Sequence, residues 1–391
     1  MFSSIPPIYA FGSNGSSQLG IGHDEDVSVP TRYASAGQTS FTLTSTSSQE
    51  KVAVKRIAAG GNHTLILLSD GRVCAAGEDS DGRCGGVYPN GKFKRVTLRD
   101  SRTDSETEPG TRCDFFKDIS ATWESSILVA LDFKSGSRED GEGNEIFVLG
   151  SGSKGELGLG PNTTISPTAQ SIPDFPPRDQ GKKIISISSG MSHTVVVLSD
   201  GSVYGWGASR KGQLGSKYVP EKIVWSPKRI AVPEGIRVTG AVCGREFTVL
   251  CGDREAGEVA TDKWGIISGI PPSSSIKGFT KILASWHGIY IHQANQTLLS
   301  WGRNDRGQLP FNSLQGVQVK DIAVGSEHGL VLREDGNVVA FGWGEHGNCG
   351  PGTDERGNVK GCSKRIELRL PRGLEVVGLG GGCATSWIVT G

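Results

Sequence analysis

The stretch ISSGMSHTVVVLSDGSVYGWGASRKGQLG (187–215) is one nearly complete copy of a repeat that extends along the chain. It begins with an apolar run, a glycine, two variable residues and a second apolar run. An Asp-Gly pair then leads into an aromatic run and a glycine-rich loop that ends in Gly-Gln-Leu-Gly. Asp-Gly between alternating apolar residues is a strong signal of a β-hairpin. The stretch therefore predicts consecutive antiparallel strands joined by tight turns.

The first half of this repeat occurs seven times, and the small residue between its two apolar runs is called the pivot. The pivots are Gly60, Thr122, Gly190, Gly244, Ser285, Gly325 and Gly381. Self-similarity at a period near 50 residues is typical of an array of equal sheets. A ring of seven blades, each with strands A to D, is the economical arrangement. We therefore predict an all-β fold, a seven-bladed β-propeller that occupies residues 1–391 as a single domain.

The order of the strands predicts how the ring closes. The chain begins with a C strand at Tyr9–Gly12 and ends with A and B strands near Val376–Thr390. The N-terminal strands should then pair with the C-terminal ones and complete the last blade, which removes exposed sheet edges. The blade around 254–280 lacks the Gly-Gln-Leu loop. Polar insertions, expected to be surface loops, lie near 34–50, 87–114, 134–144 and 352–364.

Composition excludes several classes of function. The 391 residues include 41 basic and 41 acidic side chains, so the formal net charge is zero. No basic tail is present, and we expect neither direct nucleic-acid binding nor membrane binding. The first residues have no charged and apolar segments of a signal peptide. The eight cysteines contain no Cys-x-x-Cys pair, so they are read as reduced core residues. The expected location is cytoplasmic and nuclear.

Motifs that carry catalysis are mostly absent. Two segments match Gly-x-Gly-x-x-Gly, at 150–155 and 342–347, but both occupy the same place in the repeat and indicate turn geometry rather than a dinucleotide site. His63, His193 and His328 share one repeat position, which favours a structural role between blades. His346 and Cys349 provide only two possible zinc ligands. We therefore predict no enzyme, and no catalytic, cofactor-binding or metal-binding residue.

Strand alternation indicates where a partner would bind. In an antiparallel A-B-C-D blade, the A–B turns and C–D loops emerge on one face, here called the AB/CD face, and the Asp-Gly turns on the other. The variable pairs after the pivots therefore gather on the AB/CD face, and they include Trp123-Glu124, Arg245-Glu246 and Trp286-His287. Tryptophan with a polar rim is typical of protein-binding hot spots. The alternative is that both indoles fill space between blades.

The paired motifs resemble the repeat of the regulator of chromosome condensation superfamily over essentially the whole chain. A narrower resemblance is to the fungal α-tubulin suppressors, also called killer-toxin-insensitivity propeller proteins. The segments that carry it are FGSNGSSQLGIGHDED (11–26), GGNH (60–63), GSEHG (325–329), GWGEHGNCGP (342–351) and GGCATSWIV (381–389). The resemblance implies the same seven-bladed propeller, and Trp123 and Trp286 match tryptophans of that family.

This narrower family implies a heterodimer with a small CSL-type protein whose four cysteines hold zinc or iron. The pair would support diphthamide synthesis on an elongation factor and Elongator-dependent modification of tRNA wobble uridines. The propeller itself would carry no cofactor. The residues predicted to bind the partner are His23, Asp24, Asp26, Trp123, Glu124, Glu246, Trp286, His287, Glu327, Trp343, Glu345 and His346.

Two other functions are weighed against this one. The superfamily name suggests a guanine nucleotide exchange factor for a Ran-type GTPase, which would call for a basic tail and a wedge-like insertion. The sequence has no such tail, and its insertions are hydrophilic. A propeller hydrolase is the second alternative, and no motif supports it.

Overall fold

The structure is a computed structural model that describes residues 7–33, 52–86, 91–99, 112–131, 144–177, 181–260, 272–310, 314, 316–359 and 363–391. The insertion predicted near 34–50 lies outside the described residues, as does all but the end of the one near 134–144. The insertions near 87–114 and 352–364 are described in part.

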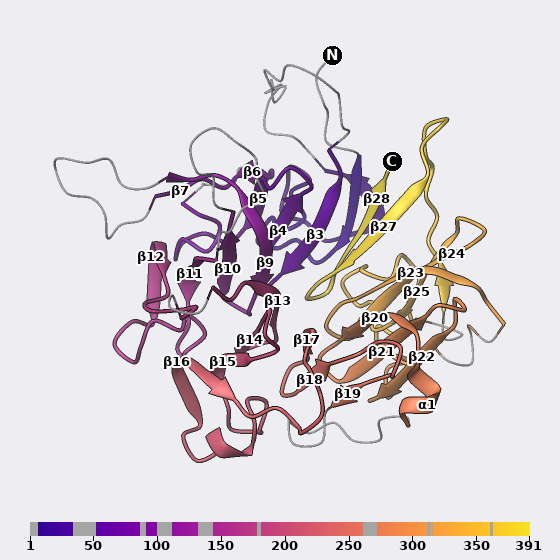
Figure 1. Cartoon of the computed structure of the whole chain (residues 1–391). Helices are drawn as coiled ribbons and strands as arrows, with labels where there is room; N and C mark the ends of the chain where they lie inside the picture. Colours follow the sequence, from indigo (N-terminus) through magenta and orange to yellow (C-terminus); the bar gives the residue numbers. More distant parts are fainter. Residues whose placement is uncertain are drawn as a thin grey trace, which may run out of the picture.

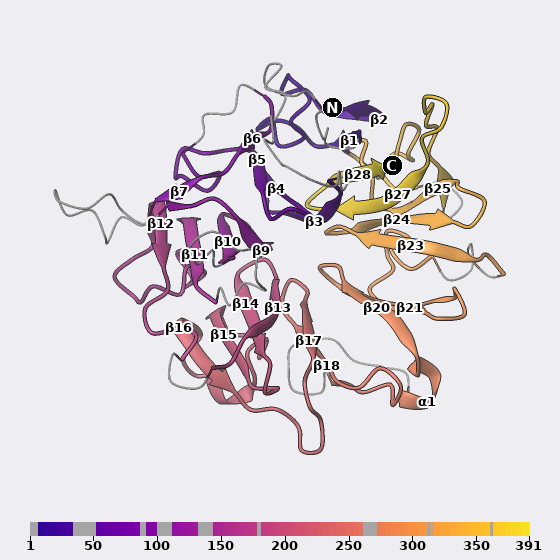
Figure 2. The ribbon, with the colours of Figure 1, turned by 45° about the horizontal axis from the view of Figure 1, so that its top comes forward.

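Seven antiparallel sheets follow one another around a ring, which confirms the all-β propeller (Figures 1 and 2). Blade 1 consists of β3 (Val54–Ala59), β4 (His63–Leu68), β5 (Val73–Gly77) and β6 (Lys94–Arg95). Blade 2 consists of β9 (Phe116–Ala121), β10 (Ser125–Ala130), β11 (Ile146–Ser151) and β12 (Ile165–Ser171). Blade 3 consists of β13 (Ile184–Ser189), β14 (His193–Leu198), β15 (Val203–Ala208) and β16 (Ile223–Ile230).

The next two blades have three strands each within the described part of the chain. Blade 4 consists of β17 (Gly240–Cys243), β18 (Thr248–Cys251) and β19 (Val259–Ala260), and blade 5 of β20 (Phe279–Ala284), β21 (Gly288–Gln293) and β22 (Leu298–Gly302). Blade 6 consists of β23 (Val319–Val324), β24 (His328–Arg333), β25 (Val338–Gly342) and β26 (Lys364–Arg365). The two-residue β19 agrees with the weak repeat signal around 254–280.

The predicted closure is confirmed in blade 7, which consists of β27 (Val376–Gly381), β28 (Thr385–Thr390), β1 (Ile8–Gly12) and β2 (Val27–Arg32). The first strand of the chain pairs with the last in continuous register, from Ile8 opposite Val389 to Gly12 opposite Thr385. The Phe11 ring of β1 is fully buried among residues of blades 6 and 7, including Leu330 and Ile388.

A few elements lie outside the blades. A two-stranded sheet joins β7 (Leu98–Arg99) to β8 (Arg112–Cys113). Within the described residues the helical segments are α1 (Ser273–Ile276) and the 3-10 turn η2 (Ser216–Tyr218). In the described ranges, no helix is long and apolar enough to cross a membrane.

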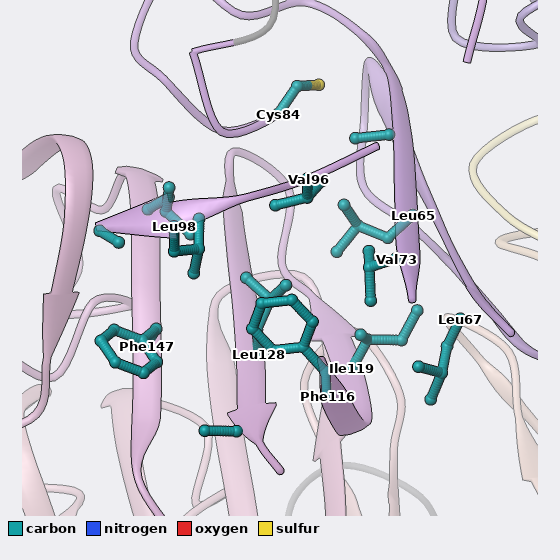
Figure 3. Close-up of a cluster of buried hydrophobic side chains, with 14 residues drawn as sticks. Leu65, Leu67, Val73, Cys84, Val96, Leu98, Phe116, Ile119, Leu128 and Phe147 are labelled. Atoms are coloured by element: carbon teal, nitrogen blue, oxygen red, sulfur yellow. The ribbon is translucent and has the colours of Figure 1, made fainter. Parts of the chain in front are cut away.

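The A strands lie innermost, because each A strand contacts the A strands of both neighbouring blades around the whole ring. Side chains of each blade point alternately toward the two neighbouring blades, so the hydrophobic core is divided among the blade interfaces. Figure 3 shows the cluster between blades 1 and 2, where Leu65 and Val73 meet Phe116 and Leu128. Packing of this kind stabilises each blade only through its neighbours.

Three of the pivots must be glycine because a neighbouring carbonyl occupies the place of a side chain. A Cβ atom on Gly60, Gly190 or Gly325 would lie 2.1 to 2.4 Å from a carbonyl oxygen of the next blade. The repeat therefore uses glycine here for close approach between blades rather than for an unusual backbone conformation.

The histidines at the shared repeat position do join neighbouring blades, and two of them reach a hydroxyl group. His193 Nε2 lies 3.0 Å from Thr248 Oγ1, and that hydroxyl donates to a backbone carbonyl in the loop after β15. His328 Nε2 lies 2.9 Å from Ser386 Oγ, which donates to a carbonyl of the loop after β25. The His63 ring is also fully buried, although neither of its nitrogens is hydrogen-bonded.

Burial of these imidazoles predicts acid sensitivity. Burial lowers the pKa of His193 and of His328 from 6.5 to about 4, and that of His63 to about 3. Between pH 6.5 and pH 4 the unfolded chain takes up protons on these groups and the folded chain does not, so acid favours unfolding. One such histidine costs about 3 kcal/mol of unfolding free energy across this window. We expect His193→Gln to reduce the slope of unfolding free energy against pH between 6.5 and 4.

The control for this prediction is His23→Gln, the same substitution at an exposed histidine. Urea titrations at a series of pH values give the two slopes. Equal slopes for His193→Gln and the wild type would contradict the role of burial.

Ring closure gives a second prediction. Phe11→Ala removes a fully buried ring from the interface of blades 6 and 7, and the cavity should lower the unfolding free energy by about 3–5 kcal/mol. Val29→Ala, in the neighbouring strand β2 but 59% exposed, should change it by less than about 0.5 kcal/mol. Urea midpoints measure both variants, and similar midpoints for the two would show that β1 does not hold the ring closed.

Candidate partner-binding face

The A–B turns and C–D loops emerge on one face, as the strand alternation predicts. In six blades a residue where the C strand meets the C–D loop donates its N–H to a carbonyl of the A–B turn in the same blade. Examples are Ser151 to Glu124 at 2.9 Å, Arg303 to His287 at 2.9 Å and Trp343 to Glu327 at 2.9 Å. The Asp-Gly turns lie at the opposite ends of the B strands. The AB/CD face is therefore one connected surface.

Three of the glycine-rich C–D loops, those of blades 3, 5 and 7, are internally fixed by the glutamine of their Gly-Gln-Leu or Ser-Gln-Leu motif. The Gln213 amide oxygen accepts the Lys211 N–H at 2.9 Å, and that of Gln308 accepts the Arg306 N–H at 2.8 Å. Gln18 does the same for Ser16 at 2.8 Å. Both Gly-x-Gly-x-x-Gly segments lie at the start of C–D loops, in blades 2 and 6, and neither is followed by a helix. The turn interpretation of these segments is confirmed.

The A–B turns are linked to one another around the mouth of the central channel. Backbone N–H groups donate to carbonyls of the next turn at five positions. These bonds run from Gly61 to Trp123 (2.8 Å), Trp123 to Met191 (2.9 Å), Arg245 to Trp286 (3.1 Å), Trp286 to Ser326 (2.9 Å) and Ser326 to Gly382 (3.0 Å). The turns therefore form a nearly continuous hydrogen-bonded ring, and the mouth has little freedom to widen.

Trp123 and Trp286 meet across this mouth, although they come from blades 2 and 5. Their ring centroids are 5.7 Å apart at an interplanar angle of 43°. Both indoles are half-buried, whereas the sequence analysis expected exposed turn residues. The Arg245 guanidinium lies 5.1 Å from the Trp286 ring centroid. Six of the seven pivots, all except Gly244, line a cavity of about 150 Å³ together with the two indoles.

Glu327 was expected to be exposed on the AB/CD face, and this expectation of exposure is wrong. The exposed fraction of Glu327 is 7%. One carboxylate oxygen lies 2.7 Å from His287 Nδ1, and the other accepts a hydrogen bond of 2.8 Å from Gln308 Nε2. Burial opposes ionisation, but these bonds outweigh it and hold the pKa of Glu327 below its usual value. Glu327 therefore positions His287 and is not free to pair with a partner.

The other predicted residues of the A–B turns are more accessible. Glu124 is exposed, and His287 and Glu246 are half-buried. Arg303 contacts this group, since its guanidinium forms an ion pair with Asp305 and lies 3.6 Å from Glu327. The sequence analysis did not single out Arg303 or Gln308 as site residues, because only the fold places the loop of blade 5 beside the turn of blade 6.

A second group of predicted residues gathers where the C–D loops of blades 6 and 7 meet. His346 Nδ1 lies 2.9 Å from the Asp26 carboxylate, and its ring packs edge-on against Trp343 with centroids 5.6 Å apart. The other Asp26 oxygen accepts the Asn14 N–H at 2.7 Å. His23, Asp24 and Glu345 are exposed beside this group.

Metal ligation finds little support among the residues that the structure describes. They contain no group of three His, Cys, Asp or Glu side chains arranged to hold an ion. His346 pairs with Asp26, whereas Cys349 is fully buried in the core and burial raises its pKa. The two possible zinc ligands therefore lie in different surroundings: His346 in a pair with Asp26, and Cys349 in the hydrophobic core.

Comparison with known proteins gives the family. The model of the RCC1-like domain matches residues 7–388. An RCC1 repeat-containing protein of Schizosaccharomyces pombe is 29% identical, over 98% of each chain. The secretion-regulating guanine nucleotide exchange factor of Bos taurus is 26% identical, over 89% of this chain and 76% of that protein.

Among solved structures, Prp20p of Saccharomyces cerevisiae aligns with a TM-score of 0.69 at 18% identity. The alignment covers 100% of this chain and 93% of that one. At this identity the likeness shows the fold alone. Together with the match along nearly the whole chain, the seven closed blades show that this protein belongs to the family of RCC1-like domain propellers.

Proposed function

We propose that this chain is a non-catalytic interaction propeller of the fungal α-tubulin suppressor group, and that its AB/CD face binds a small CSL-type protein. The observation that carries the proposal is the Trp123–Trp286 pair, two half-buried indoles fixed at the centre of a face whose rim is polar. Large aromatic side chains surrounded by polar groups are typical of binding hot spots. The proposed location is cytoplasmic and nuclear.

The arrangement suits a rigid docking platform. The turns are bonded to one another around the mouth, and three of the C–D loops are fixed by their own glutamines. A surface that is already ordered loses little conformational entropy on binding, which favours affinity. A partner of standard size would bury about 800 Å² on each side.

The consequence for the pathway follows from the resemblance to the narrower family. The partner would carry zinc or iron, and the propeller would carry no cofactor of its own. By covering or orienting that metal protein, the propeller would regulate its role in diphthamide synthesis and in Elongator-dependent modification of tRNA wobble uridines. The indoles and Glu124 would contact the partner, with His287 held in place by Glu327.

A guanine nucleotide exchange factor for a Ran-type GTPase is the second candidate. It is favoured by the similarity to the secretion-regulating exchange factor over most of this chain. Such a function would also use a propeller face for binding, but with a GTPase rather than a metal protein as partner.

The first test measures the Trp pair directly. Trp286→Ala should weaken binding of the purified CSL-type protein by about 30-fold or more, since loss of a hot-spot residue costs about 2 kcal/mol or more. The control is Ile185→Ala, a 47% exposed apolar side chain near the start of β13 and away from the AB/CD face, which should bind like the wild type. Titration calorimetry gives both affinities, and thermal melts check folding. Unchanged affinity for folded Trp286→Ala would contradict the proposed centre of the site.

The second test separates the two candidates. Added to a Ran-type GTPase loaded with fluorescent GDP, the purified chain should leave nucleotide release at its intrinsic rate. Release accelerated in proportion to the concentration of the chain would instead establish the exchange factor. An authentic exchange factor serves as the positive control in the same assay.

A further inference from the structure

The charged side chains on the AB/CD face are sorted by sign around the ring. Basic side chains belong to blades 2 to 5 and form what is called the cationic arc: Lys154, Arg210, Lys211, Arg245, Arg303 and Arg306. Acidic side chains continue from blade 6 through blades 7 and 1 to the A–B turn of blade 2 and form the anionic arc: Glu345, Asp24, Glu25, Asp26, Glu78 and Glu124.

Counter-charges within each arc are few or already engaged. In the cationic arc, Asp305 is paired with Arg303, Glu246 is half-buried, and the exposed Glu221 is followed directly by the exposed Lys222. In the anionic arc, the guanidinium of Arg83 is buried and paired with Asp81, which leaves Arg356 as the exposed basic residue of the described loops there. The chain as a whole has no net charge. The separation is therefore a property of this face and not of the composition.

Several of the charges are held in place. Arg245 stacks on Trp286 and Arg306 on Trp343, with 5.1 Å between the guanidinium carbon and the ring centroid in each case. Asp26 is fixed by His346 and by the Asn14 N–H. Lys211 belongs to a loop whose backbone is bonded by Gln213. The field across the face is thus preorganised, with the Trp123–Trp286 pair between its two halves.

We infer that this face recognises a polypeptide surface that is itself divided by charge. Acidic groups of the partner would lie over blades 3 to 5, basic groups over blades 7 and 1, and an apolar group over the indole pair. Complementary fields of this kind steer association and fix orientation, because the reversed orientation would place like charges together. The anionic half repels a nucleic-acid backbone, so a protein fits the face better than a polyanion does. The identity of the natural partner rests on the proposed function.

The test compares reversals of charge in the two arcs. One variant carries Arg210→Glu and Lys211→Glu, and the other carries Asp24→Lys and Glu25→Lys. These pairs change the net charge by equal amounts in opposite directions. Matched controls lie away from the AB/CD face: Lys228→Glu with Arg229→Glu near the far end of β16, and Glu234→Lys with Glu375→Lys in the links that lead into blades 4 and 7, all at exposed positions.

Affinity for the purified CSL-type protein is measured for each variant at low and high salt. A divided surface predicts that both arc variants bind roughly tenfold or more weakly at low salt, with a smaller effect at high salt, while both controls match the wild type. If one arc variant binds more weakly and the other more tightly, the attraction follows net charge and the inference is wrong. If neither arc variant changes binding, the partner docks elsewhere, which also overturns the inference.

A second probe keeps the inference testable if the wild-type chain does not bind the CSL-type protein. That result would refute the proposed partner but not the division of charge. Two synthetic peptides of identical composition are then compared, one with an acidic block, a central Trp-Leu and a basic block, the other with the same charges alternating. Tighter binding of the block peptide, lost in either arc variant, supports the divided surface. Equal binding or no binding of the two peptides overturns it.

Discussion

The pairing of β1 with β28 is the constraint on which the rest of the molecule depends. Each blade buries its side chains only against its neighbours, so the stability of every blade interface requires a ring without a gap. The strand at Ile8–Gly12 fills that gap, and Phe11 lies fully buried where blades 6 and 7 meet. Because the ring is closed, the seven A–B turns converge on one mouth. Only there can Trp123 and Trp286, from blades 2 and 5, reach each other.

The close approach of the blades explains the pattern of pivots. Where the pivot is Gly60, Gly190 or Gly325, any added side chain would overlap a carbonyl oxygen of the next blade. The same three blades carry the buried histidines, and two of these rings bond to a hydroxyl one blade further on. Glycine and histidine in one blade and serine or threonine in the next are thus parts of a single interface. Such pairing across blades makes the repeat uneven in sequence while it remains regular in space.

The architecture could be predicted from the sequence because its signals are local. Asp70-Gly71 and Asp200-Gly201 mark hairpins without any knowledge of the neighbours, and the strand order alone predicted closure by Tyr9–Gly12. The candidate site could be predicted only in outline. The position of Glu327 after a pivot correctly placed it on the AB/CD face, but its burial depends on His287 and Gln308, which belong to another blade. Contacts between residues so distant in the chain leave no periodic trace, and the same holds for the indole pair.

Ring closure also has a consequence for how the protein is made. During translation β1 at Ile8–Gly12 is made before the other strands of the ring, whereas its partner β28 at Thr385–Thr390 is made after them. The described strands of blades 1 to 6 are all made before β28, so these blades can pack as they are made. The edge of β1 that pairs with β28 stays unpaired until β28 has been made. Exposed strand edges are the usual starting points of misassembly in nascent chains. Blade 7 is thus the last blade to assemble. A chaperone that protects β1, or a chain that terminates before β28, would determine whether the ring closes.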